Sequence, residues 1–167
     1  MDLTPEWIVG FVEGEGSFYI GIQPSGKWFT VSPMFSISLH EKDKAVLEGI
    51  KSFFGFGTIG FTSKDSDWYK TAGINASNTC KYSVGGFEKA KILRDFFAKQ
   101  HMYSAKKKDF NIWSEVIDLM LAGKHQTREG FLEICRLRED MNTGSPRQAS
   151  FKGYDYWKSL VDPTPTP

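Results

Sequence analysis

The sequence is poor in cysteine and in net charge, and it contains no long apolar run. Two of its 167 residues are cysteines, Cys80 and Cys135. Their separation matches no metal-ligand pattern, so we interpret them as reduced thiols of an intracellular protein. No apolar run reaches the roughly 18 residues of a membrane-spanning helix, so no membrane partner is expected. The first residues lack the charged and apolar segments of a secretory signal.

The charge is distributed unevenly along the chain, although the formal net charge is only +1. Residues 1–22 contain four acids and no base, whereas residues 79–108 contain eight Lys or Arg and two acids. A near-neutral total is therefore compatible with a basic face beside an acidic centre, as in proteins that bind nucleic acid. An ordinary solvated surface would produce the same pattern, so the charges alone do not decide.

The apolar periodicity predicts an α+β fold with an antiparallel sheet whose helices cover one face. The predicted order is helix, two strands, helix, two strands, helix, and then two further helices. In sequence these are a helix starting at Pro5, strands 17–23 and 28–39, a helix 42–54, strands 58–62 and 79–84, and helices 87–99, 109–121 and 127–141. Residues 63–78 are expected to form a long hairpin tip. We predict one domain over residues 1–142 and a C-terminal extension over 143–167 that ends in a partly disordered tail.

The first predicted helix contains two glycines on one face. Gly10 and Gly14 are four residues apart, and residues at this spacing are neighbours on a helix surface. Glycine inside a helix costs about 1 kcal/mol relative to alanine. Close approach of a second helix backbone would explain both glycines, and a C-cap role for Gly14 is compatible with this.

The segment Ile8–Ser17, IVGFVEGEGS, resembles the signature of the LAGLIDADG homing endonucleases. Further similarities to that family lie in residues 35–43, 54–59, 106–110 and 124–130, so the resemblance covers about residues 5–142. It implies an αββαββα core with a saddle-shaped four-stranded antiparallel sheet, followed by additional C-terminal helices. The signature occurs once, which in this family implies a homodimer and a roughly palindromic target in double-stranded DNA. The implied dimer interface contains Trp7, Gly10, Phe11 and Gly14.

The resemblance also implies a metal-dependent double-strand cut. Glu15 matches the catalytic acid and metal ligand, and the backbone carbonyl of Gly14 matches its companion ligand. Mg²⁺ is the expected ion, because hard divalent ions prefer oxygen ligands. Mn²⁺ or Ca²⁺ could occupy the same site, with no turnover expected for Ca²⁺. Glu13 matches an acid with a structural or capping role.

Two further residues are expected in catalysis by resemblance. Lys106 matches an active-site lysine, although the match could fall instead on Lys107 or Lys108. His40 lies where relatives place a polar side chain that organises water, and Leu39 could be the matching position instead.

The outward side chains of the strands are predicted to bind DNA, because a two-stranded ribbon fits the major groove. The predicted DNA-binding residues are Ser17, Tyr19, Gly21, Gln23, Trp28, Thr30, Ser32, Met34, Ser36, Thr62, Lys64, Lys81 and Ser83. The main alternative function is an RNA-binding intron maturase on the same scaffold, with intron RNA as the partner. A DNA-binding regulator without catalysis and a purely structural dimer domain are two further possible functions of this scaffold. By resemblance we expect an organellar location.

Overall fold

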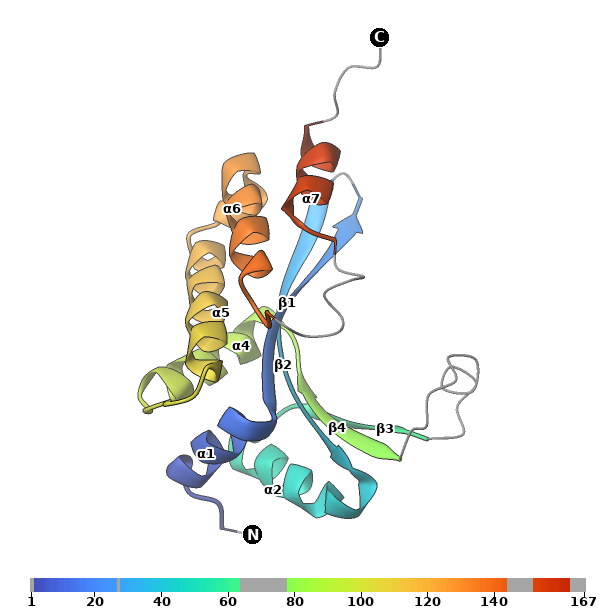
Figure 1. Ribbon diagram of the computed structural model, residues 1–167, viewed down its shortest axis with the longest axis vertical. Coiled ribbons are helices and arrows are strands. Elements are labelled where there is room, and N and C mark those ends of the chain that lie inside the picture. Colours follow the sequence, from blue (N-terminus) through green and yellow to red (C-terminus); the bar gives the residue numbers. More distant parts are fainter. Residues whose placement is uncertain (1, 27, 64–77, 144–151, 163–167) are drawn as a thin grey trace.

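The structure is a computed structural model that describes residues 2–26, 28–63, 78–143 and 152–162 (Figure 1). Lys64 of the predicted DNA-binding set lies outside the described residues, as do most of the hairpin tip predicted for residues 63–78 and the tail 163–167. Within the described part of the chain, no helix is long and apolar enough to span a bilayer.

As far as α6, the helices and strands follow the predicted order. They are α1 (Pro5–Glu15), β1 (Gly16–Ser25), β2 (Trp28–His40), α2 (Lys44–Phe54), β3 (Thr58–Thr62), β4 (Thr79–Val84), α4 (Phe87–Ala98), α5 (Lys106–Leu121), α6 (Arg128–Glu139) and α7 (Tyr154–Val161). Two short 3-10 helices, η1 (Glu41–Asp43) and η2 (Lys124–Gln126), precede α2 and α6.

Two predictions of secondary structure need correction. α5 begins at Lys106 and not at Asp109, because the three lysines at its start carry no apolar periodicity from which a helix could be predicted. No regular element was expected after Asn142, yet α7 forms there and buries Trp157, which is 2% exposed. A helix of eight residues has too few turns to show a clear period, and it is held by contacts with distant parts of the chain.

The four strands form one antiparallel sheet in the order β1-β2-β4-β3. Helices α4, α5 and α6 lie along one side of it, whereas α1 and α2 lie at the end where β1 begins (Figure 1). The predicted alternation is confirmed, since Phe18, Phe35 and Ile37 are fully buried under the helices. The other face of the sheet is left open, and its side chains are mostly small and polar.

An aromatic cluster fills the core between the sheet and the helices. Phe18 of β1 is at its centre, with ring centroids 5.4 Å from Phe97, 5.5 Å from Phe110 and 5.2 Å from Trp113. Burying a side chain of this size contributes about 1.5–3 kcal/mol. The cluster joins β1 to α4 and α5, so the strand that follows α1 is firmly anchored.

The turn into β3 depends on one glycine. Gly57 has a φ of +98°, and a Cβ there would lie 2.3 Å from a ring carbon of Tyr82. The Tyr82 hydroxyl donates a hydrogen bond to the carbonyl of Phe56 at 2.9 Å, which holds the ring against the turn. Burial raises the pKa of Tyr82 above its usual range, so the hydroxyl stays a donor. Only glycine combines this backbone conformation with the close contact.

Candidate active site and nucleic-acid interface

Glu15 is the last residue of α1, and its side chain is exposed. The helix passes directly into β1 at Gly16, where a Cβ would lie 2.6 Å from a methyl carbon of Val12. This tight junction has no loop, so the position of Glu15 is set jointly by a helix and a strand. Among the described residues, Glu15 has no hydrogen-bond or ion-pair partner, which leaves its carboxylate available for a ligand.

The face of α1 that carries the glycines is open. A Cβ added at Gly10 or Gly14 would meet nothing within 4 Å. On this side of the helix Trp7 stacks on Phe11, with ring centroids 4.8 Å apart and an interplanar angle of 11°, and Trp7 is still 40% exposed. Val9 lies on the opposite side, 5% exposed in the protomer's own core. The predicted interface residues therefore share an uncovered surface.

Glu13 ties α1 to the segment before α5. One of its carboxylate oxygens accepts hydrogen bonds from the backbone N–H groups of Tyr103 and Ser104, the latter at 2.6 Å. The bond from Ser104 is the main cause of a lowered pKa for Glu13, and partial burial acts in the opposite direction. The structural role expected for this acid is therefore seen directly. Its two partners are backbone groups, which leave no signal in a sequence.

The same segment leads to the lysines. The Ser104 hydroxyl accepts a hydrogen bond from the backbone N–H of Lys106 at 3.3 Å. The Lys106 side chain is half-buried, whereas Lys107 and Lys108 are exposed. Lysines at the positive end of a helix are unfavourable unless an anion is close by. Glu13 thus connects the helix that ends in Glu15 to the helix that begins with Lys106.

His40 lies at the end of β2, and its placement gives it a local role. Its Nδ1 accepts a hydrogen bond from the backbone N–H of Lys42 at 3.2 Å, which caps η1. Gly16 pairs with Ile37, so His40 is three strand positions beyond that row, about 10 Å along the strand. A catalytic role for His40 stays a prediction.

Rows of polar side chains cross the open face of the sheet. The pairing of the strands aligns Ser17 with Ser36, Ser36 with Ser83, and Ser83 with Thr58. One row of hydroxyl groups therefore spans all four strands, two residues from Glu15. Thr58 was missed by the sequence prediction, although its even spacing from Thr62 places both on the outward face.

Two members of the predicted DNA-binding set differ from expectation, Trp28 in its placement and Ser36 in its burial. Trp28 turns toward the helices: its Nε1–H donates to the carbonyl of His125 at 3.1 Å, and its ring lies 5.8 Å from that of Phe131. A large aromatic ring is better buried than exposed at a strand end. Ser36 faces outward as expected, but it is only 5% exposed.

Tyr19 and Lys81 explain the burial of Ser36. They lie on opposite sides of it, Tyr19 two residues beyond Ser17 on β1 and Lys81 two residues before Ser83 on β4. The diagonal between them passes over Ser36, and the Lys81 ammonium lies 5.7 Å from the centroid of the Tyr19 ring. Charged and aromatic groups at this distance attract each other. The surface above Ser36 is therefore formed by the other two side chains.

The donors at the end of α1 suit a hard divalent ion in kind. Glu15 offers carboxylate oxygens, and the carbonyl of Gly14 belongs to the last helical turn, whose carbonyls lack intrahelical donors. These two donors are too few to complete the coordination of such an ion. The described residues contain no cluster of three or more His, Cys, Asp or Glu side chains. Further oxygen ligands would have to come from water, a phosphate or a second copy of this site.

Fold and site together place the chain among α+β proteins that present an open antiparallel sheet next to an acidic helix end. The LAGLIDADG endonuclease profile matches residues 8–117, and the chain belongs to this family. The resemblance noted in the sequence is thereby confirmed.

Individual relatives agree with this assignment. The chain is 33% identical over 146 residues to the "Probable intron-encoded endonuclease 2" of Neurospora crassa, covering 85% of this chain and 30% of that protein. The homing endonuclease I-TnaI has a similar structure, with a TM-score of 0.79 and 29% identity over 96% of this chain and 99% of that one. I-SmaMI, bound to an uncleaved DNA target in the presence of calcium ions, gives a TM-score of 0.75 and 27% identity over 99% of this chain and 51% of that one.

Two of these three relatives are much longer than the present chain. It spans less than a third of the Neurospora relative and about half of the I-SmaMI chain, but it matches I-TnaI along nearly its whole length.

Proposed function

We propose that the chain is a site-specific homing endonuclease that acts as a homodimer and cuts both strands of a long, pseudo-palindromic DNA target. The proposal is carried by the position of Glu15, an exposed carboxylate at the end of a helix whose Gly10–Gly14 face is uncovered. If two copies dock through this face, their symmetry brings the two Glu15 side chains together, one for each DNA strand.

In the proposed site, the Glu15 carboxylate and the Gly14 carbonyl would hold Mg²⁺. A bound divalent ion stabilises charge on the scissile phosphate and lowers the pKa of an attacking water. Lys106 would add positive charge where negative charge develops, at a position maintained by the Glu13 hydrogen bonds. The polar rows of the open sheet face would meet base edges in the major groove.

The test compares binding and cutting in matched variants. A target is first obtained by selecting cleaved sites from a randomised DNA library. Glu15→Gln keeps the size of the side chain but removes its charge, so it should retain affinity for the target and lose cleavage. Glu6→Gln changes an exposed acid at the opposite end of α1 and should cut normally. If Glu15→Gln cuts at the wild-type rate in purified metal, the assignment of the acid is wrong.

The metal and the dimer have separate tests. Mg²⁺ and Mn²⁺ should support cutting, whereas Ca²⁺ should support binding to intact DNA. Sedimentation of the protein with its full-length target should give two chains per DNA, and a single bound chain would overturn the symmetric assembly. The organellar location and the intron maturase alternative stay predictions, and no contact of the described residues favours the maturase.

A further inference from the structure

The β1–β2 hairpin extends well beyond the rest of the sheet. β4 pairs with β2 only over residues 35–40, whereas β1 and β2 remain paired as far as Ser25 and Trp28. A two-stranded ribbon on its own is marginally stable in water at best. The far half of the hairpin therefore needs support from elements outside the sheet.

Part of that support comes from the end of α6 and the turn that follows it. The Arg138 Nε–H donates to the carbonyl of Ile20 at 2.8 Å, and the Asn142 side-chain amide donates to the carbonyl of Phe18 at 2.9 Å. β1 is an edge strand, so these carbonyls lack a neighbouring strand and need other donors. The two side chains attach this edge to the helical layer.

The far end of the hairpin is supported by aromatic packing, in which α7 supplies one ring. Phe29 stacks on Phe131 of α6, with ring centroids 4.6 Å apart and an interplanar angle of 12°. Trp157 of α7 meets Phe29 edge to face at 5.6 Å and is only 2% exposed. Aromatic pairs in these geometries add about 0.5–1.5 kcal/mol each to the effect of burial. The half-buried Phe29 thus lies between α6 and α7.

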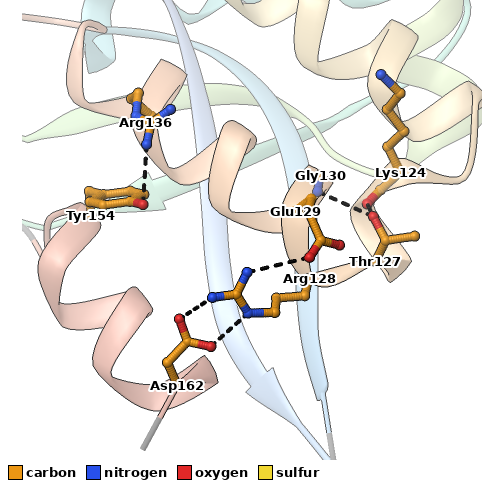
Figure 2. A network of polar contacts seen from close by, with 8 residues as sticks. All are labelled: Lys124, Thr127, Arg128, Glu129, Gly130, Arg136, Tyr154 and Asp162. Carbon is orange, nitrogen blue, oxygen red and sulfur yellow. Dashed lines mark hydrogen bonds and ion pairs between the residues drawn. The ribbon is translucent and has the colours of Figure 1, made fainter. Parts of the chain in front are cut away.

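Polar contacts fix α7 to α6. At its C-terminal end, the Arg128 guanidinium binds both carboxylate oxygens of Asp162, with 2.6 Å between Nε and Oδ1 (Figure 2). At its N-terminal end, the Arg136 guanidinium donates to the Tyr154 hydroxyl at 3.2 Å (Figure 2). The Glu139 carboxylate also accepts a hydrogen bond from the Tyr154 backbone N–H at 2.6 Å. α7 is therefore held at both ends as well as through Trp157.

Phe29 is next to a pair of polar residues, Thr30 and Gln23, near the end of the hairpin. Thr30 follows Phe29, and it pairs across the hairpin with Gln23. Successive side chains of a strand point to opposite faces, so Phe29 faces the helices while Thr30 faces the open side. Gln23 is seven residues along β1 from Gly16, about 23 Å from the α1 end. Contacts made here would affect distant base pairs and not the chemistry.

We propose that α7 is a positioning element for recognition of the outer base pairs of each half-site, acting through Trp157 and Phe29 on Thr30 and Gln23. The inference rests on the proposed function, because it assigns a specificity role within the same DNA-binding surface. Figure 1 shows the geometry it depends on, with α7 beside the far end of the hairpin and α1 at the opposite end of the molecule.

The test uses the full chain with Trp157→Ala. Cleavage is measured on every single-base-pair variant of the selected target. We expect discrimination at the outer positions of each half-site to fall by about tenfold, the effect of a lost contact worth about 1.4 kcal/mol, with central positions and the rate on the intact target unchanged. Leu160→Ala, which removes an exposed apolar side chain from the same helix, should alter neither. Equal loss at all positions, or none, would overturn the proposal.

A second variant tests the proposal if Trp157→Ala does not fold, and a second measurement tests it without DNA. If Trp157→Ala does not fold, Asp162→Ala removes a peripheral ion pair and should produce a smaller loss at the same outer positions. Hydrogen exchange of the free protein gives a readout without DNA: Trp157→Ala should speed exchange of the amides of residues 19–23 and 28–32 and leave β3 and β4 unchanged. If the wild-type protein binds no DNA but the hairpin still loosens, the proposed function fails and the support by α7 stands. An unchanged exchange pattern would refute the support itself.

Discussion

The Glu13 carboxylate in α1 accepts a hydrogen bond from the backbone N–H of Ser104 at 2.6 Å, across 91 residues of sequence. Two residues after Ser104, α5 begins with Lys106. The acid at the end of α1 and the lysines at the start of α5 are therefore linked by one side chain. Glu13 takes no part in the proposed chemistry itself. It aligns the two helix ends that carry Glu15 and Lys106, the groups that do take part.

Glu13→Gln should slow cleavage without removing the catalytic acid. The amide keeps one oxygen as an acceptor but loses the charge that strengthens both hydrogen bonds. A small displacement of a catalytic group can lower a rate by about a hundredfold, so we expect a loss of about tenfold to a hundredfold in single-turnover cleavage, with DNA affinity nearly unchanged. A cleavage rate equal to that of the wild type would show that Lys106 is positioned by other contacts.

The same carboxylate predicts a dependence of stability on pH. Its folded-state pKa is lowered below the ordinary value of 4.5, chiefly by the Ser104 N–H. Its stabilising effect is therefore complete above that value and is lost as the pH falls through the lower, folded pKa. In thermal unfolding, the advantage of the wild type over Glu13→Gln should be constant from about pH 7 to 5 and shrink in more acidic buffers. A difference that is the same at every pH would contradict this role.

The three lysines at the start of α5 should differ in their effects on cleavage. Lys106 is half-buried, whereas Lys107 and Lys108 are exposed. Replacing each by methionine keeps most of the length of the unbranched side chain and removes its charge. We expect Lys106→Met to lower the cleavage rate by about 10²- to 10³-fold, as for the loss of one group that stabilises the transition state. The other two variants should mainly weaken binding, with a reduced salt dependence. Equal effects of all three on the rate would exclude a special role for Lys106.

Gly10→Ala should have opposite effects on the protomer and on the dimer. A Cβ at this position meets nothing within 4 Å in the protomer, and alanine is favoured in a helix by about 1 kcal/mol. The monomer should therefore become more stable, while dimerisation, measured by sedimentation equilibrium, should weaken if Gly10 lies at the interface. Asn111→Ala, at an exposed position of α5, is the matched control, since it favours the helix without touching α1. Unchanged dimerisation in Gly10→Ala would place the interface elsewhere.

Tyr19 and Lys81 should act as a coupled pair in DNA binding. Their attraction across Ser36 is worth about 0.5–1 kcal/mol at an exposed site, so each helps to fix the other on the open face. A double-mutant cycle of Tyr19→Leu and Lys81→Met, measured by target affinity, should give losses that do not add. Additive losses would mean that the two side chains separate when DNA binds and contribute independently.

Much of the fold could be predicted because its signals are local. The alternation of Phe18 and Ile20 with Ser17 and Tyr19 identified which face of β1 is buried. The Thr4 side chain accepts a hydrogen bond from the Trp7 N–H at 3.2 Å, as its position before Pro5 predicted. The motif itself is contiguous, so the sequence sufficed to indicate Glu15 and the glycine face of α1.

The site was predicted less completely, since several of its features depend on contacts between distant residues. Trp28 was expected on the DNA-binding face, but the carbonyl of His125, 97 residues away, receives its indole N–H. The burial of Ser36 depends on two side chains from other strands. Neither effect leaves a pattern in the segment where it occurs.

The sequence by itself determined the order of the elements up to α6, the two faces of the sheet and the family, because periodicity, capping residues and a continuous motif are properties of neighbouring residues. Only the tertiary structure decided what Glu13 holds and what supports the hairpin. The hydrogen bond from Arg138 to Ile20 joins residues 118 positions apart. Such contacts form only when the folded chain brings their atoms within reach, and an edge carbonyl or a backbone N–H bonds with whichever partner the fold places there.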